Sequence, residues 1–345
     1  MKKIHWQEEL ELFPTAFWER YFSGCRIGVL DIETTGLNQS RDRFILGGLY
    51  DTKERIMHQV FAQTRGEEKE ALEAFMDLVN RMDAVITYNG RHFDSAFLRE
   101  RLAVCGLPAG PMPYDLDLYR MVSGHSPLRR FVPNLRQKTL ENYMGLWSDR
   151  TDEISGGDSV ELYDEYCRTQ DAELERQILL HNSDDVLQLT RLTRVLPKCD
   201  VHRAMYKMGF PAGSPGRMVH VERIDFHRDR LLISGLQKDD PIAFRCYELD
   251  GQPVFADFDP ESGGFRAEVP LVLRSGICVV DLRALNMGEH EFDGYPTSGS
   301  GFLVLREGDE YRCREINHFV RRFIQRIETE TRPGAPALQD KEEQR

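Results

Sequence analysis

The residues best placed to do chemistry are two carboxylates in the stretch from Val29 to Leu37, VLDIETTGL. An apolar run leads into Asp31 and Glu33, and a Thr-Thr-Gly turn follows them. Side chains two residues apart on a strand project to the same face, so both acids face one way. Two acids at the end of a buried strand are costly unless a cation lies between them. The pair predicts a divalent-metal site; the alternative is an exposed strand end at which Asp31 only caps the turn.

A further acid, Asp94, follows the predicted strand that ends in ITYNG, at residues 86–90. It falls where the next helix is predicted to begin, so it is either a metal ligand or an ordinary helix N-cap, a position that Asp favours. Asp115 and Asp117 share one face of a later predicted strand. We expect these two to support a neighbouring turn rather than to bind metal.

The last polar pair, His181 and Asp185, is four residues apart, so on a helix the two side chains share one face. An apolar stripe continues along the same helix, and its members are Val186, Leu189, Leu192 and Val195. This stripe predicts that the helix packs on the sheet and carries the pair to its edge. The alternative is a solvated helix face.

The elements that must position these side chains follow from hydrophobic periodicity. We predict strands over residues 27–32, 44–50, 55–61, 84–88 and 113–118. We predict helices over 67–81, 94–104, 139–144, 160–167 and 172–196, the last with a break near His181. Hairpin-linked strands followed by alternating helices indicate an α/β fold with a mixed five-stranded sheet flanked by helices, over residues 24–200. Aromatic residues at helical spacing predict that residues 1–23 form an N-terminal helical segment.

Composition changes after about Asp200, where short β-prone segments alternate with Gly and Asp turns. Strands at this spacing predict a smaller β-rich barrel or sandwich domain over residues 201–312. Residues 313–345 are predicted to form a helix, over 317–327, and a disordered polar tail.

The chain has 345 residues and a formal net charge of −12, which argues against a protein that coats polyanions generally. Its seven cysteines are scattered without zinc-like spacing, so isolated thiols are expected. No apolar run is long enough to span a bilayer, and the first residues lack a signal-peptide core. We expect a cytoplasmic protein without a membrane partner.

One segment, from Leu118 to Leu140, carries basic residues and no acid. Its interpretations are a solvated loop or a phosphate-facing patch. The basic residues are Arg120, Arg129, Arg130, Arg136 and Lys138.

The acidic motifs together are far more specific than any one of them. Asp31-x-Glu33, Asn89-x-x-x-Phe93-Asp94 and His181-x-x-x-Asp185 resemble the three exonuclease motifs of the DEDD group of the ribonuclease H-like superfamily, over roughly residues 24–196. Further blocks resemble the bacterial YprB-type ribonuclease H-like domain: residues 113–118, 138–142, Arg150, 154–156, Tyr163 and 181–186. In that family the last block usually begins Tyr-Asn, and here His181 stands at the tyrosine position.

The resemblance implies a metal-dependent nuclease, a 3'–5' exonuclease that acts on single-stranded ends of DNA or RNA with two Mg²⁺ or Mn²⁺ ions. Asp31 would bridge the ions, with Glu33 and Asp185 on the ion that activates water. Asp94 would serve the second ion, largely through waters, and His181 would accept a proton.

Nucleic acid is the implied partner. Tyr88 and Asn89 are candidate contacts to the terminal nucleotide, although a turn-forming Asn is the simpler interpretation of Asn89. The phosphate backbone would meet four basic residues, Arg129, Arg130, Arg136 and Lys138.

Two other interpretations compete with the nuclease. The acidic balance and the departure at His181 are compatible with a catalytically inactive nucleic-acid-binding or scaffolding protein that retains the fold. A soluble α/β module whose acids are only surface charges is the other, and Mn²⁺ titration would separate it from the first two.

Overall fold

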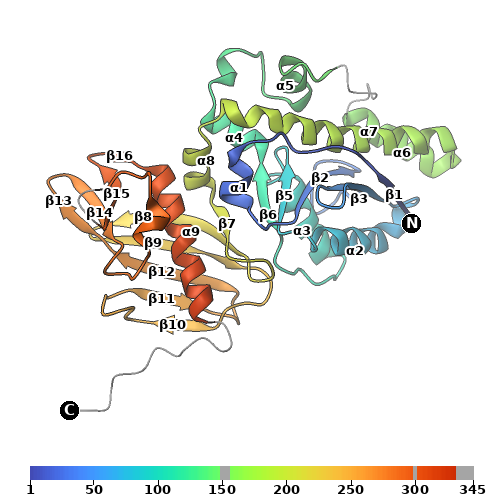
Figure 1. Cartoon of the computed structure of the whole chain (residues 1–345). Coiled ribbons are helices and arrows are strands. Elements are labelled where there is room, and N and C mark those ends of the chain that lie inside the picture. Colours follow the sequence, from blue (N-terminus) through green and yellow to red (C-terminus); the bar gives the residue numbers. More distant parts are fainter. Residues whose placement is uncertain (148–155, 298–300, 332–345) are drawn as a thin grey trace. The chain divides into compact units, whose positions relative to one another are not determined.

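The computed structural model describes residues 1–147, 156–297 and 301–331, and Arg150, Ile154 and Ser155 lie outside these ranges. The chain divides into two compact units, Met1–Val201 and His202–Arg345. Each is described by itself (Figure 1).

The first unit is built on a six-stranded sheet in the order β1-β4-β3-β2-β5-β6. The strands β1 to β4 pair antiparallel, whereas β2, β5 and β6 pair parallel, so the sheet is mixed, as predicted. The strands are β1 Lys2–Gln7, β2 Ile27–Thr34, β3 Phe44–Asp51, β4 Ile56–Phe61, β5 Ala84–Thr87 and β6 Tyr114–Asp117.

The sheet has six strands rather than the predicted five, because the start of the segment that was predicted to be helical forms a strand. Residues Lys2–Gln7 form β1, which pairs with β4 at the edge of the sheet, and only Ala16–Phe22 forms a helix, α1. The strand buries little of its surface, with Ile4 and Trp6 half-buried. Its backbone pairing, rather than a strong apolar pattern, stabilises it, and the two lysines at its start are typical of an exposed edge.

Helices cover both faces of this sheet (Figure 1). Leu30 and Ile32 of β2 belong to an apolar cluster with residues of α2, Glu68–Val79, and α3, Asp94–Val104. The opposite face packs against α6, Gly156–Thr169, and α7, Ala172–Leu192, through Tyr163 and Ile178. The predicted break near His181 does not occur: α7 runs without interruption from Ala172 to Leu192.

Shorter elements complete the connections. The basic segment forms α4, Leu118–His125, a 3-10 turn η2, Leu128–Arg130, and the start of α5, Gln137–Tyr143. This unit also contains η1 Arg65–Glu67 and η4 Thr193–Lys198. The helices α8 Val201–Met208 and η5 Glu289–Phe292 belong to the second unit, apart from Val201.

The second unit contains two antiparallel sheets with the orders β10-β11-β12-β9-β8-β7 and β13-β14-β15-β16, and neither is closed into a barrel by the strands described. The first comprises β7 Phe210–Ala212, β8 Val219–His227, β9 Arg230–Gln237, β10 Phe244–Cys246, β11 Phe255–Phe258 and β12 Gly264–Pro270. The second comprises β13 Val272–Arg274, β14 Ile277–Asp281, β15 Phe302–Glu307 and β16 Glu310–Tyr311.

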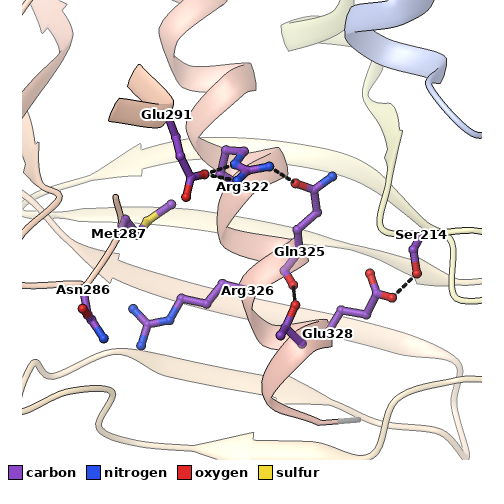
Figure 2. A pocket seen from close by; sticks show the side chains of 9 residues that line it. Ser214, Asn286, Met287, Glu291, Arg322, Gln325, Arg326 and Glu328 are labelled. Carbon is purple, nitrogen blue, oxygen red and sulfur yellow. Dashed lines mark hydrogen bonds and ion pairs between the residues drawn. The ribbon is translucent and has the colours of Figure 1, made fainter. Parts of the chain in front are cut away.

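The last helix, α9, spans Cys313–Glu330, longer than predicted at both ends, and packs on β7 and β15. A pocket of about 500 Å³ lies beside it (Figure 2). Charged side chains around this pocket have partners: Arg322 pairs with Glu291, Arg326 pairs with Asp250 and Glu330, and Glu328 accepts from the Ser214 hydroxyl. None of the helices in the described ranges is long and apolar enough to cross a membrane.

Candidate active site

Alternation along β2 sends its acids and its apolar residues to opposite faces of the sheet. Leu30 and Ile32 join the cluster beneath α2 and α3, whereas Asp31 and Glu33 meet α7 and α6. Glu33 is buried, and its Oε2 accepts a hydrogen bond from the Ser159 hydroxyl of α6 at 3.0 Å. Asp31 is half-buried. The two acids therefore share one face, as the two-residue spacing predicts.

Asp94 reaches the same strand from its edge. The parallel pairing of β2 with β5 runs from Ile27 to Val29, which leaves the later backbone groups of β2 free of β5. The Oδ1 of Asp94 accepts the N–H of Ile32 at 3.2 Å, between the two acids in sequence. Asp94 is the first residue of α3, and the N-cap is Phe93. Asp94 thus bonds to β2 rather than capping its own helix.

His181 and Asp185 come from α7, on the face that packs against the sheet. The Nε2 of His181 lies 3.7 Å from Glu33 Oε1 and 3.8 Å from Asp185 Oδ2, and the imidazole is buried. From α5, the Gln137 amide donates to the backbone carbonyl of Asp185 at 3.1 Å. The structure therefore brings motifs from β2 and α7 together around one imidazole.

The four acids lie close enough to affect the pKa of Asp31. Burial raises the pKa of Asp31 well above its ordinary value, and the nearby carboxylates Asp94, Asp185 and Glu33 raise it further. Burial, with the charge of Asp115, raises the pKa of Asp94 to about 8. Carboxylates crowded together without a cation favour their protonated forms. The shifts therefore report an excess of negative charge at this point of the sheet.

The donor set fits a hard divalent cation. Its oxygen donors are carboxylates, which Mg²⁺ and Mn²⁺ prefer, and a cation would relieve their repulsion. Among the side chains that the structure describes, no group of three or more His, Cys, Asp and Glu residues is arranged to hold a metal ion as it stands.

Asp115 and Asp117 have the supporting role that was predicted. Asp115 accepts hydrogen bonds from the hydroxyls of Thr87 and Ser95, both at 2.6 Å. Burial nevertheless raises its pKa to about 6, against the effect of those hydroxyls. Asp117 accepts from the backbone N–H of Asn89 at 2.9 Å and caps α4. These acids hold the turn that carries Asn89.

A pocket of about 500 Å³ gathers three of the predicted nucleic-acid contacts. Tyr88, Asn89 and Arg136 line it together with Tyr119, Asn134, Leu135 and Gln137. The hydroxyl of Tyr88 donates to the carbonyl of Leu135, and Asn89 has a left-handed φ of 66°. Gln137 contacts both this pocket and Asp185. The other predicted contacts do not line it: Arg129 and Arg130 are exposed on η2, and Lys138 is on α5.

Several side chains of the site were not singled out from the sequence: Asn182, Gln59, Ser159 and Gln137. The one local signal was the Gly47-Gly48 doublet in β3, since glycine within a strand marks a close approach of another chain segment. Hydrogen bonds between distant polar residues have no such signature in a single sequence.

One family model matches the first unit. Residues 29–196 match the family model described as RNase_H superfamily. No curated protein sequence matches the chain. Among solved structures, it is similar to the family B DNA polymerase from the hyperthermophilic archaeon Pyrobaculum calidifontis, with 20% identity, a TM-score of 0.41, and coverage of 50% of this chain and 25% of the polymerase.

A second similar structure is exonuclease I, with 12% identity, a TM-score of 0.33, and coverage of 61% of this chain and 55% of that chain. This chain therefore spans a quarter of the polymerase and about half of exonuclease I. With the mixed sheet and its flanking helices, the family match identifies residues 29–196 as a domain of the RNase H superfamily.

Proposed function

We propose that this protein is a metal-dependent nuclease of the DEDD type, close to the YprB-type domains, that acts as a 3'–5' exonuclease on single-stranded ends of DNA or RNA. The observation that supports this most is the convergence of Asp31, Glu33, Asp94 and Asp185 from β2, α3 and α7. Structural ion pairs alone would not require four acids at one point, because each unneutralised carboxylate destabilises the others.

The four carboxylates would hold two Mg²⁺ or Mn²⁺ ions, with Asp31 shared between them. Bound ions would neutralise charge on the phosphate and lower the pKa of the attacking water. Glu33 is oriented for this role by Ser159, and Asp94 by the Ile32 N–H. Side chains held in this way need little reorganisation when substrate arrives.

His181 is proposed to accept the proton of the attacking water. Its Nε2 lies between the carboxylates of Glu33 and Asp185, 3.7 and 3.8 Å away. Two negative charges at this distance can stabilise the positive charge that the ring gains. The burial of His181 also keeps its ring in one position relative to both acids.

The nucleotide at the scissile bond is proposed to lie against the pocket of Tyr88 and Asn89. Gln137 joins the wall of this pocket to the backbone of Asp185, so the pocket adjoins the carboxylates. Arg136 lines the pocket, and Arg129, Arg130 and Lys138 would meet phosphates farther along the strand.

The test is hydrolysis of single-stranded DNA and RNA oligonucleotides, labelled at either end, with Mn²⁺ or Mg²⁺. Wild type should shorten strands from the 3' end, and Asp31→Asn and Asp185→Asn should abolish the products. Glu173→Gln is the matched control on α7, because Glu173 is exposed and pairs only with its own helix through Arg176 and Gln177. Absence of hydrolysis, or equal hydrolysis by Asp31→Asn, would overturn the proposal. Salt-sensitive binding without turnover would favour the inactive scaffold.

A further inference from the structure

One row of residues crosses the sheet beneath α7. Asp31 of β2 is in register with Gly48 of β3, which is in register with Gln59 of β4. Residues in register on neighbouring strands share a face of the sheet. The row thus has a side chain at each end and none in the middle.

Asn182 of α7 fills the space above the glycine. A Cβ at Gly48 would lie 2.2 Å from Asn182 Oδ1 and 3.0 Å from Val186 Cγ2, too close for any larger residue without displacement. Asn182 and Gln59 are both buried. The absence of a side chain at Gly48 therefore allows α7 to pack closely on β3, and the Asn182 amide contacts both Gln59 and Asp31.

The hydrogen bonds of this row have a fixed direction. Gln59 Nε2 donates to the backbone carbonyl of Leu179 at 2.8 Å and to Asn182 Oδ1 at 3.1 Å. At the other end, Asn182 Nδ2 donates to the carbonyl of Asp31 at 3.2 Å and to its Oδ2 at 3.1 Å. Backbone carbonyls only accept, so both amides have one possible orientation.

We propose that Asn182, held by Gln59 across Gly48, is a positioning residue that sets the orientation of the Asp31 carboxylate for cation binding. This rests on the proposed function, since it concerns the same site. The Asn182 amide donates hydrogen bonds to both the backbone carbonyl and the carboxylate of Asp31, and this restricts rotation of the Asp31 side chain. A carboxylate fixed before the cation arrives loses less conformational freedom on binding, and partners behind metal ligands typically change metal affinity by about 10–100-fold.

Two substitutions can distinguish a positioning role of Asn182 from a role in packing, because they remove different hydrogen bonds of the row. Gln59→Leu removes the donor that orients Asn182 and replaces it with an apolar side chain of similar size, without removing a bond to Asp31. Asn182→Ala removes the contact to Asp31 directly. Ser183→Ala is the matched control, because Ser183 is the next buried residue of α7 and its hydroxyl donates within the helix, to the Leu180 carbonyl at 3.0 Å.

The experiment follows the melting temperature of each variant during Mn²⁺ titration without nucleic acid, which reports cation binding independently of turnover. Relative to wild type, the midpoint Mn²⁺ concentration should rise about 10–100-fold in Asn182→Ala and about 10-fold in Gln59→Leu. Ser183→Ala should keep the wild-type midpoint. If Asn182→Ala does not fold, Gln59→Leu decides the question.

The outcomes distinguish the two proposals. Stabilisation of wild type by Mn²⁺ that disappears in Asp31→Asn, with unchanged midpoints in Asn182→Ala and Gln59→Leu, would overturn the positioning role and leave the nuclease standing. Absence of any Mn²⁺ stabilisation in wild type would overturn the metal site itself, and with it both proposals.

Discussion

The carboxylate of Asp94 accepts the backbone N–H of Ile32 at 3.2 Å, which ties the first turn of α3 to the strand that carries Asp31 and Glu33. The bond is possible because β5 stops pairing with β2 before Ile32. A backbone donor left free at a sheet edge must find another acceptor. Here that acceptor is a carboxyl group, so the bond that satisfies the backbone also places Asp94 beside Asp31 and Glu33.

The stability of the metal-free protein should depend on pH through Asp94. Its pKa rises from an ordinary value of 3.8 to about 8, so between these values the folded state holds a proton that the unfolded state has lost. The free energy of unfolding should therefore be highest near pH 4 and fall as pH rises toward 8. Asp94→Asn should flatten this decline, since it keeps an oxygen acceptor for Ile32 without a charge. Urea unfolding in EDTA at several pH values measures it, and an unchanged slope in the variant would refute it.

A buried ion pair should be essential to the loop that follows β2. Arg101 and Glu68 form a bidentate pair, at 2.7 and 2.9 Å, and their side chains are 6% and 7% exposed. Glu68 also accepts the Phe44 N–H. Arg101→Ala should cost about 3–5 kcal/mol of unfolding free energy, because it leaves a buried charge unpaired.

The matched control for this pair is Arg65→Ala. Arg65 pairs with Asp164, but these side chains are 55% and 47% exposed. The loss there should be below about 1 kcal/mol. Equal losses in the two variants, measured by chemical denaturation, would show that the buried pair has no special role.

Ser159 should matter for turnover more than for folding. Its buried hydroxyl donates to Glu33 Oε2 at 3.0 Å, so Ser159→Ala leaves that carboxylate less firmly oriented. We expect kcat to fall about tenfold, at the lower limit typical of residues behind metal ligands. Thr169→Ala should behave as wild type, because Thr169 is exposed at the end of the same helix and its hydroxyl bonds only nearby backbone: it donates to the Glu165 carbonyl and accepts the Asp171 N–H. A loss of stability without a loss of kcat at saturating Mn²⁺ would argue against this role.

Arg136 should contribute to binding of the strand without changing the chemical step. It lines the pocket of Tyr88 and Asn89 and is exposed. Arg136→Ala should raise KM, leave kcat near wild type, and reduce the salt slope of single-strand binding by about 0.7 for one lost phosphate contact. Arg176→Ala is the control, since Arg176 is exposed on α7 and pairs with Glu173. Fluorescence anisotropy across a salt series measures the slope, and an unchanged slope would exclude a phosphate contact.

Local patterns predicted the parts of the fold that burial dictates. The apolar runs of β2 and β5 and the periodic faces of α2 and α3 are buried, so they are visible as patterns in the sequence. Strand β1 was missed because it lies at an edge and has only two half-buried side chains. Its pairing depends on backbone groups that every residue possesses.

The acids of the site were predictable from spacing, whereas their orientation was not. The positions of Asp31 and Glu33 follow from strand alternation alone. The contacts of Asn182 with Gln59, by contrast, join residues 123 positions apart. Such a pair depends on how closely α7 packs on β3, which is decided by Gly48 and cannot be derived from either residue's neighbours.

The most direct measurement of the central claim is the number of Mn²⁺ ions bound by the intact chain, determined by calorimetric titration or by electron paramagnetic resonance. The proposed two-ion site predicts two ions for wild type, weaker binding at one of them for Asp94→Asn, and loss of both for Asp31→Asn. Absence of saturable Mn²⁺ binding, or wild-type stoichiometry and affinity in Asp31→Asn, would contradict the account.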